Sequence, residues 1–375
     1  MSGDLAVTVF DVGHGDAILI RFPDRSVGII DCCTDGHGRN PLLDALREMG
    51  SPHIRFVCLT HPHADHCRGL PEILDEYSGQ IDQFWHTMTD LQEALTLYKD
   101  AAVYEDTEEG GVLLDPSEKY LEYEVRPVVN TLHRALTLLG NKVSRIRQFQ
   151  IVSTFKTGGL DVEILSVSPF ASDLREYADC VYSHITCGNP KQEALDSTMI
   201  NCVSAALIMA VSCADKTWSI AFTGDLVGEK MKSAAQLIKR SKTLGRFLPV
   251  DAFKSPHHGA TDSVYDGLWP EWVHRPGVVL VSAKGGRHPS REHVESLRTE
   301  RGVRCFSTGL GKVCPDRDHP DFDAWEIVRR DILPGYGPDK CCGTVHLSLR
   351  QDDHGDWSVE MTPNDPPSFC PVCSS

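Results

Sequence analysis

The densest group of chemically capable side chains lies in the segment Leu-Thr-His-Pro-His-Ala-Asp-His, residues 59–66. It places three imidazoles and one carboxylate within six residues, and these are nitrogen and oxygen donors that zinc and similar divalent metals bind. The segment follows an apolar run that predicts a buried strand, and a loop at a strand end can turn neighbouring side chains towards one point. We therefore predict a metal-binding loop whose ligands are His61, His63, Asp65 and His66.

Three later segments supply more groups of the same kind. Asp225 follows an apolar run at residues 218–222, and His257 and His258 follow another predicted strand. His288 stands just before a predicted helix. Because the strands of an αβ sheet deliver side chains to a shared rim, we expect these groups to meet the metal loop there. A carboxylate in that position can bridge two cations.

The elements that must position these residues alternate between strand and helix. Runs of β-branched residues predict the strands, and apolar periodicity between capping residues predicts the helices. Strands are expected at residues 5–10, 17–22, 27–31, 54–60, 160–167, 203–211, 218–222, up to 253, and 278–282, and helices at 41–49, 117–139, 229–240 and 290–299. The longest apolar run, residues 199–213, is interpreted as a buried strand.

Two regions depart from this alternation. Residues 86–160 lose the strand rhythm, hold an acidic stretch and predict a helical insertion, either a lid or a surface for a protein partner. Residues 311–375 form a C-terminal extension with a Cys-rich tail, in which a hairpin is expected between residues 343–349 and 357–361. Residues 1–310, including the insertion, are expected to form the main domain.

Composition excludes several classes of protein. The chain has 375 residues, 41% of them hydrophobic, so it can bury a sizeable core and is not expected to be disordered. It carries 37 Lys+Arg against 53 Asp+Glu, a formal net charge of -16. Such a chain does not hold nucleic acid or an anionic membrane mainly through a basic surface. A bound polyanion would need a local cation, which a metal can supply.

The sequence shows no sign of export or membrane insertion. The N-terminus lacks the basic and apolar regions of a secretory signal, and the longest apolar run is shorter than the roughly 18 residues of a bilayer span. We expect a cytoplasmic protein in which the 14 cysteines are mostly reduced. We favour free thiols over a four-thiolate zinc site for the poorly spaced tail cysteines, Cys341, Cys342, Cys370 and Cys373.

In this order the motifs resemble those of the metallo-β-lactamase-like hydrolases and, within them, the soluble domain of the ComEC-type competence proteins that act in DNA uptake. The matching segments are Phe-Asp-Val-Gly-His-Gly-Asp at 10–16, Ile-Ile-Asp at 29–31, the metal loop, Thr-Gly-Asp at 223–225, Pro-His-His-Gly at 256–259 and His-Pro-Ser at 288–290. The resemblance spans residues 5–310 and implies an α+β fold, a four-layer αββα sandwich with a metal site at the edge of its two sheets.

The resemblance implies two divalent metal ions, Zn or Mn. The ligands by motif position are His61 and His63 for the first metal, Asp65 and His66 for the second, Asp225 as the bridge, and either His257 or His288 as the last ligand.

Other residues of these motifs have two interpretations each. Asp11, Asp16 and Asp31 lie in turns that the resemblance places near the metal loop, where each is either a partner of a ligand or an ordinary turn residue. His14 replaces the family's usual Gln, and it either touches substrate or caps the turn.

One departure weakens the first metal site. Many family members have a histidine before a buried strand as the third protein ligand of the first metal, and this chain has Ile200 there. ComEC-type proteins typically show an Asn and a Ser in this stretch, as Asn201 and Ser204 do here. We therefore expect the first metal to bind more loosely than the second, unless His257 or Asn201 completes its site.

The function that the resemblance implies is hydrolysis by a metal-activated hydroxide, and we expect a phosphodiesterase or nuclease acting on DNA or nucleotides. Asp65 or Asp225 would orient the attacking water. His257, His258 and Lys254 would stabilise charge on the phosphate or protonate the leaving oxygen. Lys254 has an equally good interpretation as an exposed lysine at a strand end.

Two alternatives remain open from the sequence. The family also hydrolyses other esters, thioesters and lactones, so the ligands alone do not select the bond that is cleaved. A metal-stabilised regulatory or partner-binding module with little turnover is compatible with the missing ligand at Ile200 and with the insertion at residues 86–160.

Overall fold

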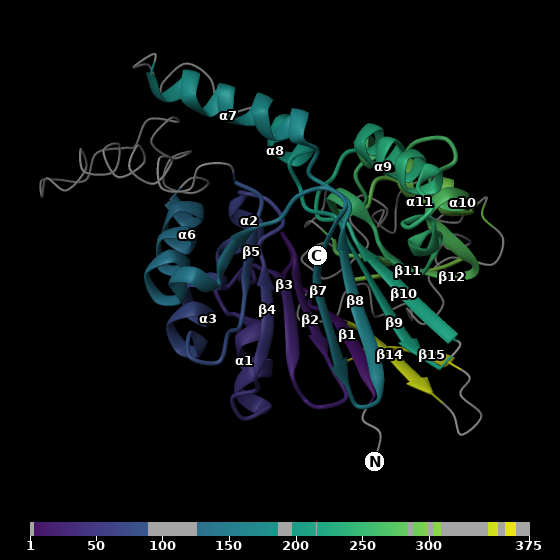
Figure 1. Ribbon diagram of the computed structural model, residues 1–375, viewed down its shortest axis with the longest axis horizontal. Helices are drawn as coiled ribbons and strands as arrows, with labels where there is room; N and C mark the ends of the chain where they lie inside the picture. Colours follow the sequence, from purple (N-terminus) through teal and green to yellow (C-terminus); the bar gives the residue numbers. More distant parts are fainter. Residues whose placement is uncertain are drawn as a thin grey trace, which may run out of the picture.

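The computed structural model describes residues 4–88, 126–186, 197–214, 216–283, 288–298, 300, 303–308, 344–351 and 357–364. In this part of the chain two β-sheets lie face to face, and helices cover their outer faces (Figure 1). None of the described helices is long and apolar enough to cross a membrane.

The first sheet combines the N-terminal meander with a hairpin from the far end of the sequence. Its strands in spatial order are β15 (Trp357–Asn364), β14 (Thr344–Gln351), β1 (Leu5–Val9), β2 (Ala17–Arg21), β3 (Val27–Cys32), β4 (Ile54–Cys58), β5 (Phe84–His86) and β6 (Val143–Arg145). The predicted hairpin is confirmed, and β14 pairs antiparallel with β1 so that Leu5 lies opposite Leu349. These strands therefore belong to the first sheet, although the sequence placed them in an extension.

The second sheet is parallel over half of its width. Its strands in spatial order are β13 (Val303–Ser307), β12 (Val273–Val281), β11 (Val250–Lys254), β10 (Lys216–Phe222), β9 (Leu207–Cys213), β8 (Leu160–Ser166) and β7 (Gln150–Thr157). The pairs from β10 to β13 are parallel, and so are those from β3 to β6 in the first sheet. Loops that follow these strands therefore emerge together at the edge of each sheet.

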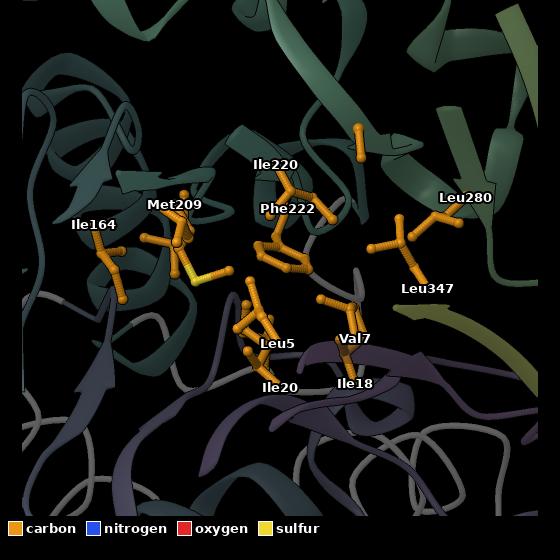
Figure 2. Packing of buried hydrophobic residues seen from close by; sticks show 14 of the residues in the cluster. Leu5, Val7, Ile18, Ile20, Ile164, Met209, Ile220, Phe222, Leu280 and Leu347 are labelled. Atoms are coloured by element: carbon orange, nitrogen blue, oxygen red, sulfur yellow. The ribbon is translucent and has the colours of Figure 1, made fainter. Parts of the chain in front are cut away.

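A hydrophobic core fills the space between the sheets. Alternation along β2 sends Ile18 and Ile20 into this core, while Leu19 faces the helices on the outer side. Figure 2 shows Leu5, Val7, Ile18, Ile20 and Leu347 of the first sheet near Ile164, Met209, Ile220, Phe222 and Leu280 of the second. The inward faces of both sheets are thus apolar, as a sandwich requires.

Helices form the two outer layers, and the expected four-layer αββα sandwich is confirmed (Figure 1). The first sheet is covered by α1 (Pro41–Glu48), α3 (Leu70–Tyr77) and α6 (Arg126–Leu139), and the second by α9 (Gly228–Arg240), α10 (Leu268–Trp272) and α11 (Arg291–Arg298). α1 begins as predicted, because the Asn40 side chain accepts a hydrogen bond of 3.1 Å from Leu43 N. The short 3₁₀ helices are η3 (Gly140–Lys142), η4 (Gly245–Phe247), η5 (Pro256–Gly259) and η6 (Thr261–Ser263).

Two expectations about the elements were wrong, and one helix was not predicted. The apolar run at residues 199–213 is not one strand: it begins in helix α8 (Ser197–Cys202), and β9 starts only at Leu207. The predicted helical insertion at residues 86–160 contains the strands β6 and β7. A long helix, α7 (Ala171–Thr186), was not predicted, and it extends away from the sandwich beside α8 (Figure 1). Residues 89–125, with the acidic stretch, and the tail cysteines lie outside the described residues.

Candidate metal centre

Strands of both sheets carry the predicted metal-binding residues to one place. Asp31 lies near the end of β3, and the metal loop, with the short helix α2 (Ala64–Cys67), follows β4. Asp225 follows β10, and His258 follows β11 within η5. The first two strands belong to one sheet and the last two to the other, so the site is built between the two halves of the sandwich.

The turn between β1 and β2 packs directly against the metal loop. Asp16 N donates a hydrogen bond of 3.1 Å to the carbonyl oxygen of Asp65. Gly15 has a φ of +125°, and a Cβ atom at this position would lie 2.0 Å from the same carbonyl oxygen. Only a residue without a side chain fits so close an approach. The glycine of the turn motif therefore brings Asp16 next to Asp65.

Asp225 lies at the centre of a cluster of imidazoles. Its Oδ1 lies 3.4 Å from His66 Nε2, and its Oδ2 lies 3.6 Å from His258 Nε2 and 3.9 Å from His61 Nε2. His258 Nε2 is also 3.8 Å from Asp65 Oδ2. Two ligand atoms that are each about 2.1 Å from a tetrahedral zinc ion lie about 3.4 Å apart. These separations are therefore close to those of atoms that share a metal ion.

Four overlapping groups of buried side chains have the composition of a metal site. They are His61–His66–Asp225, Asp65–His66–His258, Asp16–Asp225–His258 and Asp16–Asp31–His66, each with ligand atoms within 4.8 Å of one another. His66 recurs in three of the groups and Asp225 in two.

Hydrogen bonds determine which ring nitrogen of His66 and His61 faces Asp225. His66 Nδ1 lies 2.7 Å from Asp31 Oδ2, and because a carboxylate only accepts, Nδ1 carries the proton. The Thr60 hydroxyl donates to the same oxygen at 2.6 Å, which leaves it to accept from His61 Nδ1 at 3.0 Å. In the neutral form, both imidazoles therefore direct an unprotonated Nε2 towards Asp225.

The same arrangement orients His258. Ser282 Oγ donates to Asp16 Oδ1, so it accepts from His258 Nδ1, which lies 3.0 Å away. Nε2 of His258 is again the nitrogen that faces the cluster. Carboxylates that hold an imidazole through its far nitrogen are the usual support of histidine metal ligands.

Several buried polar atoms at the centre of the cluster make no hydrogen bond within the part of the chain that the structure describes. They are His66 Nε2, His258 Nε2 and both carboxylate oxygens of Asp225. Leaving a buried polar atom unsatisfied costs roughly 1–3 kcal/mol, and more for a charged group. Cations bound between these atoms would satisfy all of them, so the donor set fits divalent metal ions.

Mutual electrostatic effects keep the central carboxylate ionised. Burial raises the pKa of Asp225, but the imidazoles of His258 and His66 outweigh burial and hold this pKa well below its usual value. Burial lowers the pKa of His66, yet Asp225 and Asp31 raise it well above the usual range. A cation that binds His66 must therefore displace a proton, so we expect metal affinity to fall as the pH is lowered.

A family model matches the segment of the chain that contains the metal loop. The model of the metallo-β-lactamase superfamily matches residues 10–86, from the turn after β1 through the metal loop to β5. This span folds into the part of the first sheet that carries Asp16, Asp31 and the metal loop, opposite the second sheet with Asp225 and His258. The two sheets with their outer helices form a metallo-β-lactamase-like αβ sandwich. No protein with a curated description matches the sequence significantly.

Solved structures resemble the chain at low sequence identity. A B3 metallo-β-lactamase with an active-site glutamic acid is 12% identical, with a TM-score of 0.34 over 70% of this chain and 84% of its own. A β-lactamase from Chitinophaga pinensis is 13% identical, with a TM-score of 0.32 over 69% and 82%. Human tRNase Z, short form, is 13% identical, with a TM-score of 0.35 over 80% and 91%. Similarity at this level carries no information about substrate.

Three predicted ligands lie beside the cluster of side chains around Asp225. His63 Nδ1 is 2.9 Å from His61 Nε2. His257 Nε2 is 3.8 Å from the central carboxylate, and its ring centroid lies 5.8 Å from that of His288. Among the described residues, none of the three belongs to a group with all ligand atoms within 4.8 Å, whereas His258, predicted only as a catalytic residue, belongs to two. The identity of the last ligand stays a prediction.

Lys254 is buried, which decides one of its two interpretations from the sequence. Its side chain is fully buried at the end of β11, and its ammonium donates a hydrogen bond to Asp16 Oδ2. The interpretation as an exposed lysine is therefore wrong. The predicted contact of Lys254 with a substrate phosphate stays a prediction.

The three turn aspartates differ in their roles. Asp16 and Asp31 contact the imidazoles of the cluster, as described above. Asp11 instead accepts a hydrogen bond of 3.2 Å from Gly13 N within its own turn, and burial raises its pKa to about 6. His14 is half-exposed, and its Nε2 lies 3.3 Å from Asp65 Oδ2, so it reaches the cluster from the solvent side.

The position of the missing histidine is filled by an apolar residue. Ile200 packs in a small buried cluster with Leu174, Tyr177 and Val203, between α7 and α8. The neighbouring Asn201 is buried, and its Nδ2 lies 3.5 Å from His257 Nε2. The side chain after Ile200 therefore contacts the site, while Ile200 itself stabilises the two helices.

Three supporting residues were not identified from the sequence. Thr60 and Ser282 orient His61 and His258, and Asp262 Oδ1 lies 2.8 Å from His257 Nδ1. Thr60 could have been suspected because it directly precedes the metal loop. Hydroxyl and turn carboxylate groups are common, and no sequence signal marks the other two.

Proposed function

We propose that this protein is a two-metal phosphodiesterase that acts on DNA or nucleotides. A buried His/Asp metal site in a metallo-β-lactamase fold is the kind of site that metal-dependent hydrolases use. The observation that carries the proposal is the placement of Asp225, whose Oδ1 faces His66 while its Oδ2 faces His61 and His258. A carboxylate with imidazoles on both sides is suited to bridge two cations.

The chemistry that two divalent cations supply at such a site is the activation of water at neutral pH and the polarisation of phosphoryl oxygens. The residues of the chain hold and orient the reacting groups. Asp65 carries a carboxylate oxygen 3.8 Å from His258 Nε2, where it can accept a hydrogen bond from the attacking water. Asp262 holds His257 through Nδ1 at 2.8 Å, so that Nε2 can give a proton to the leaving oxygen.

Support for a phosphodiester substrate comes from the resemblance of the turn at residues 10–16 and of the Pro-His-His-Gly motif to the ComEC type. The charge of the chain restricts the kind of substrate. At a net charge of -16, tight non-specific binding to duplex DNA is not expected. A small, single-stranded or partner-delivered phosphodiester meets the positive field of the cations without needing a basic surface.

The test is hydrolysis by purified protein loaded with Mn²⁺ or Zn²⁺, assayed against single-stranded DNA, duplex DNA, bis(p-nitrophenyl) phosphate and a thioester. The proposal predicts turnover of the phosphodiesters, with single-stranded DNA cleaved faster than duplex. Asp225→Asn keeps the shape of the central side chain and removes its charge, so its rate should fall by about 100-fold or more. Asp82→Asn, at an exposed site, is the matched control and should keep the wild-type rate.

Two outcomes would contradict the proposal. Turnover of the thioester alone would exclude a phosphodiesterase and favour a hydrolase of another bond. One tightly held metal per chain with no turnover of any substrate would favour a metal-stabilised binding or regulatory module.

A further inference from the structure

Lys254 places an ammonium group inside the candidate metal centre. The residue ends β11, its side chain is fully buried, and Nζ donates to Oδ2 of Asp16, which is 1% exposed. The two residues are 238 positions apart in the sequence and join the two sheets at the site. Removing an ammonium from water costs several kcal/mol even after the protein relaxes, so this arrangement is not explained by stability alone.

Asp16 is also a neighbour of the candidate ligands. Its Oδ1 accepts a hydrogen bond from Ser282 Oγ and lies 3.4 Å from His258 Nδ1. Together with Asp225 and His258, Asp16 offers ligand atoms that lie within 4.8 Å of one another. Two roles are therefore open to this carboxylate. It can support His258 from behind, or it can join Asp225 in coordinating a cation.

We propose that Lys254 is a fixed internal cation that keeps Asp16 out of metal coordination, so that Asp16 orients His258 and the centre binds its metals less tightly than its carboxylates would allow. A protonated ammonium neutralises a carboxylate as a metal does, but it has no lone pair and cannot become a ligand. It also repels a nearby divalent cation, and burial weakens the screening of this repulsion. The inference rests on the proposed metal centre, and it makes Lys254 a positioning residue.

The proposal predicts that loss of the Lys254 charge raises metal affinity, whereas loss of an ordinary supporting residue lowers it. Removing a group that orients a metal ligand usually weakens metal affinity by about 10- to 100-fold. Lys254→Met keeps much of the length of the side chain and removes its charge, so Asp16 is left to bind the cation that Asp225 and His258 hold. Metal affinity should therefore rise. Lys254→Arg keeps the charge and is the matched control.

The experiment is a titration of chelator-treated, full-length protein with Zn²⁺ at about pH 7.5, in competition with a chromophoric chelator of known affinity. In Lys254→Met the Kd of the tightest site should fall by about tenfold or more, and in Lys254→Arg it should stay within about threefold of the wild type. The double variant Asp16→Asn/Lys254→Met also removes the carboxylate that would become the new ligand, so its Kd should not fall below that of the wild type. A gain in affinity like that of Lys254→Met would overturn the proposal. Unchanged or weaker binding by folded Lys254→Met would overturn the proposal.

Circular dichroism of each cation-free variant checks the fold. If Lys254→Met does not fold, Lys254→Gln carries the test, because its amide also lacks a charge but can still donate a hydrogen bond to Asp16. Zinc binding by Lys254→Gln that is unchanged or weaker than that of the wild type then overturns the proposal, since weaker binding is the result of simple loss of support for His258. A wild-type protein that binds no zinc at this centre overturns the proposed function itself, whereas wild-type binding that Lys254→Met leaves unchanged overturns this inference alone.

Discussion

Asp31→Asn should weaken metal binding because it forces the proton of His66 from Nδ1 to Nε2. Asp31 accepts three hydrogen bonds: Oδ1 from Thr60 N at 2.8 Å, and Oδ2 from the Thr60 hydroxyl at 2.6 Å and from His66 Nδ1 at 2.7 Å. An asparagine must keep its oxygen on the side of Thr60 N, because a backbone amide cannot become an acceptor. Its NH₂ group then faces His66 Nδ1, which can adapt only by moving its proton to Nε2, the nitrogen that faces Asp225.

The expected size of the effect follows from this loss of support. Asp31 has a φ of +54°, a conformation that asparagine adopts readily, so the substitution tests the hydrogen bonds and charge with little change of backbone. Loss of a carboxylate that orients a metal-binding histidine lowers affinity by about 10- to 100-fold, or about 1.4 to 2.7 kcal/mol. The assay is zinc titration of chelator-treated protein, with Asp82→Asn as the control at an exposed site. An Asp31→Asn protein that binds zinc within about threefold of the wild type would refute the assignment of ring nitrogens.

Three further predictions test the turn, the hairpin and a buried histidine. Gly15→Ala places a Cβ 2.0 Å from Asp65 O, so it should lower the Tm in calorimetry and abolish tight zinc binding. A wild-type Tm and wild-type zinc affinity would show that the contact with Asp65 O does not constrain the turn. Leu347→Ala should lower the free energy of unfolding in urea by about 2 to 5 kcal/mol, because Leu347 is fully buried between the sheets. The control Leu138→Ala, at a site 43% exposed, should lower it by less than about 0.5 kcal/mol. Equal losses of stability in the two variants would contradict the place of the hairpin in the core. Burial, with a smaller contribution from a nearby arginine, lowers the pKa of His86 to about 4. Below about pH 6.5 His86 therefore binds a proton in the unfolded chain but stays neutral in the folded chain. The free energy of unfolding should therefore fall as the pH drops below about 6.5. Between about pH 8 and pH 5 the wild type should lose about 2 kcal/mol more than His86→Gln. The same pH dependence in both proteins would exclude a neutral buried His86.

Local sequence patterns predicted the parts of the fold in which short-range order dominates. The first three strands follow from apolar alternation, as in Ile18 and Ile20, and the metal loop follows from the density of donors after a strand. The apolar run at residues 199–213 was misassigned because an apolar run without periodicity fits a buried helix as well as a strand. Its first part became α8, where Ile200 packs against α7. β7 was missed because it is half-exposed and carries few apolar residues in alternation.

The supporting contacts of the site could not be predicted from local sequence patterns, because they join residues that are far apart in the sequence. Asp16 meets Lys254 across 238 residues and Ser282 across 266. The sequence marked Asp16 as a possible neighbour of the metal loop only through the family resemblance. It offered no way to choose between an exposed and a buried Lys254, because that depends on which carboxylate the folded chain places beside it.

The central claim is that two cations bind on the two sides of Asp225, and anomalous diffraction from crystals grown with Zn²⁺ tests it most directly. Our account predicts two peaks in the anomalous difference map, each about 2.2 Å from one carboxylate oxygen of Asp225, with the Nε2 atoms of His66 and His258 among the remaining ligands. Zinc peaks located only at other histidines, or a single peak that does not contact Asp225, would contradict it.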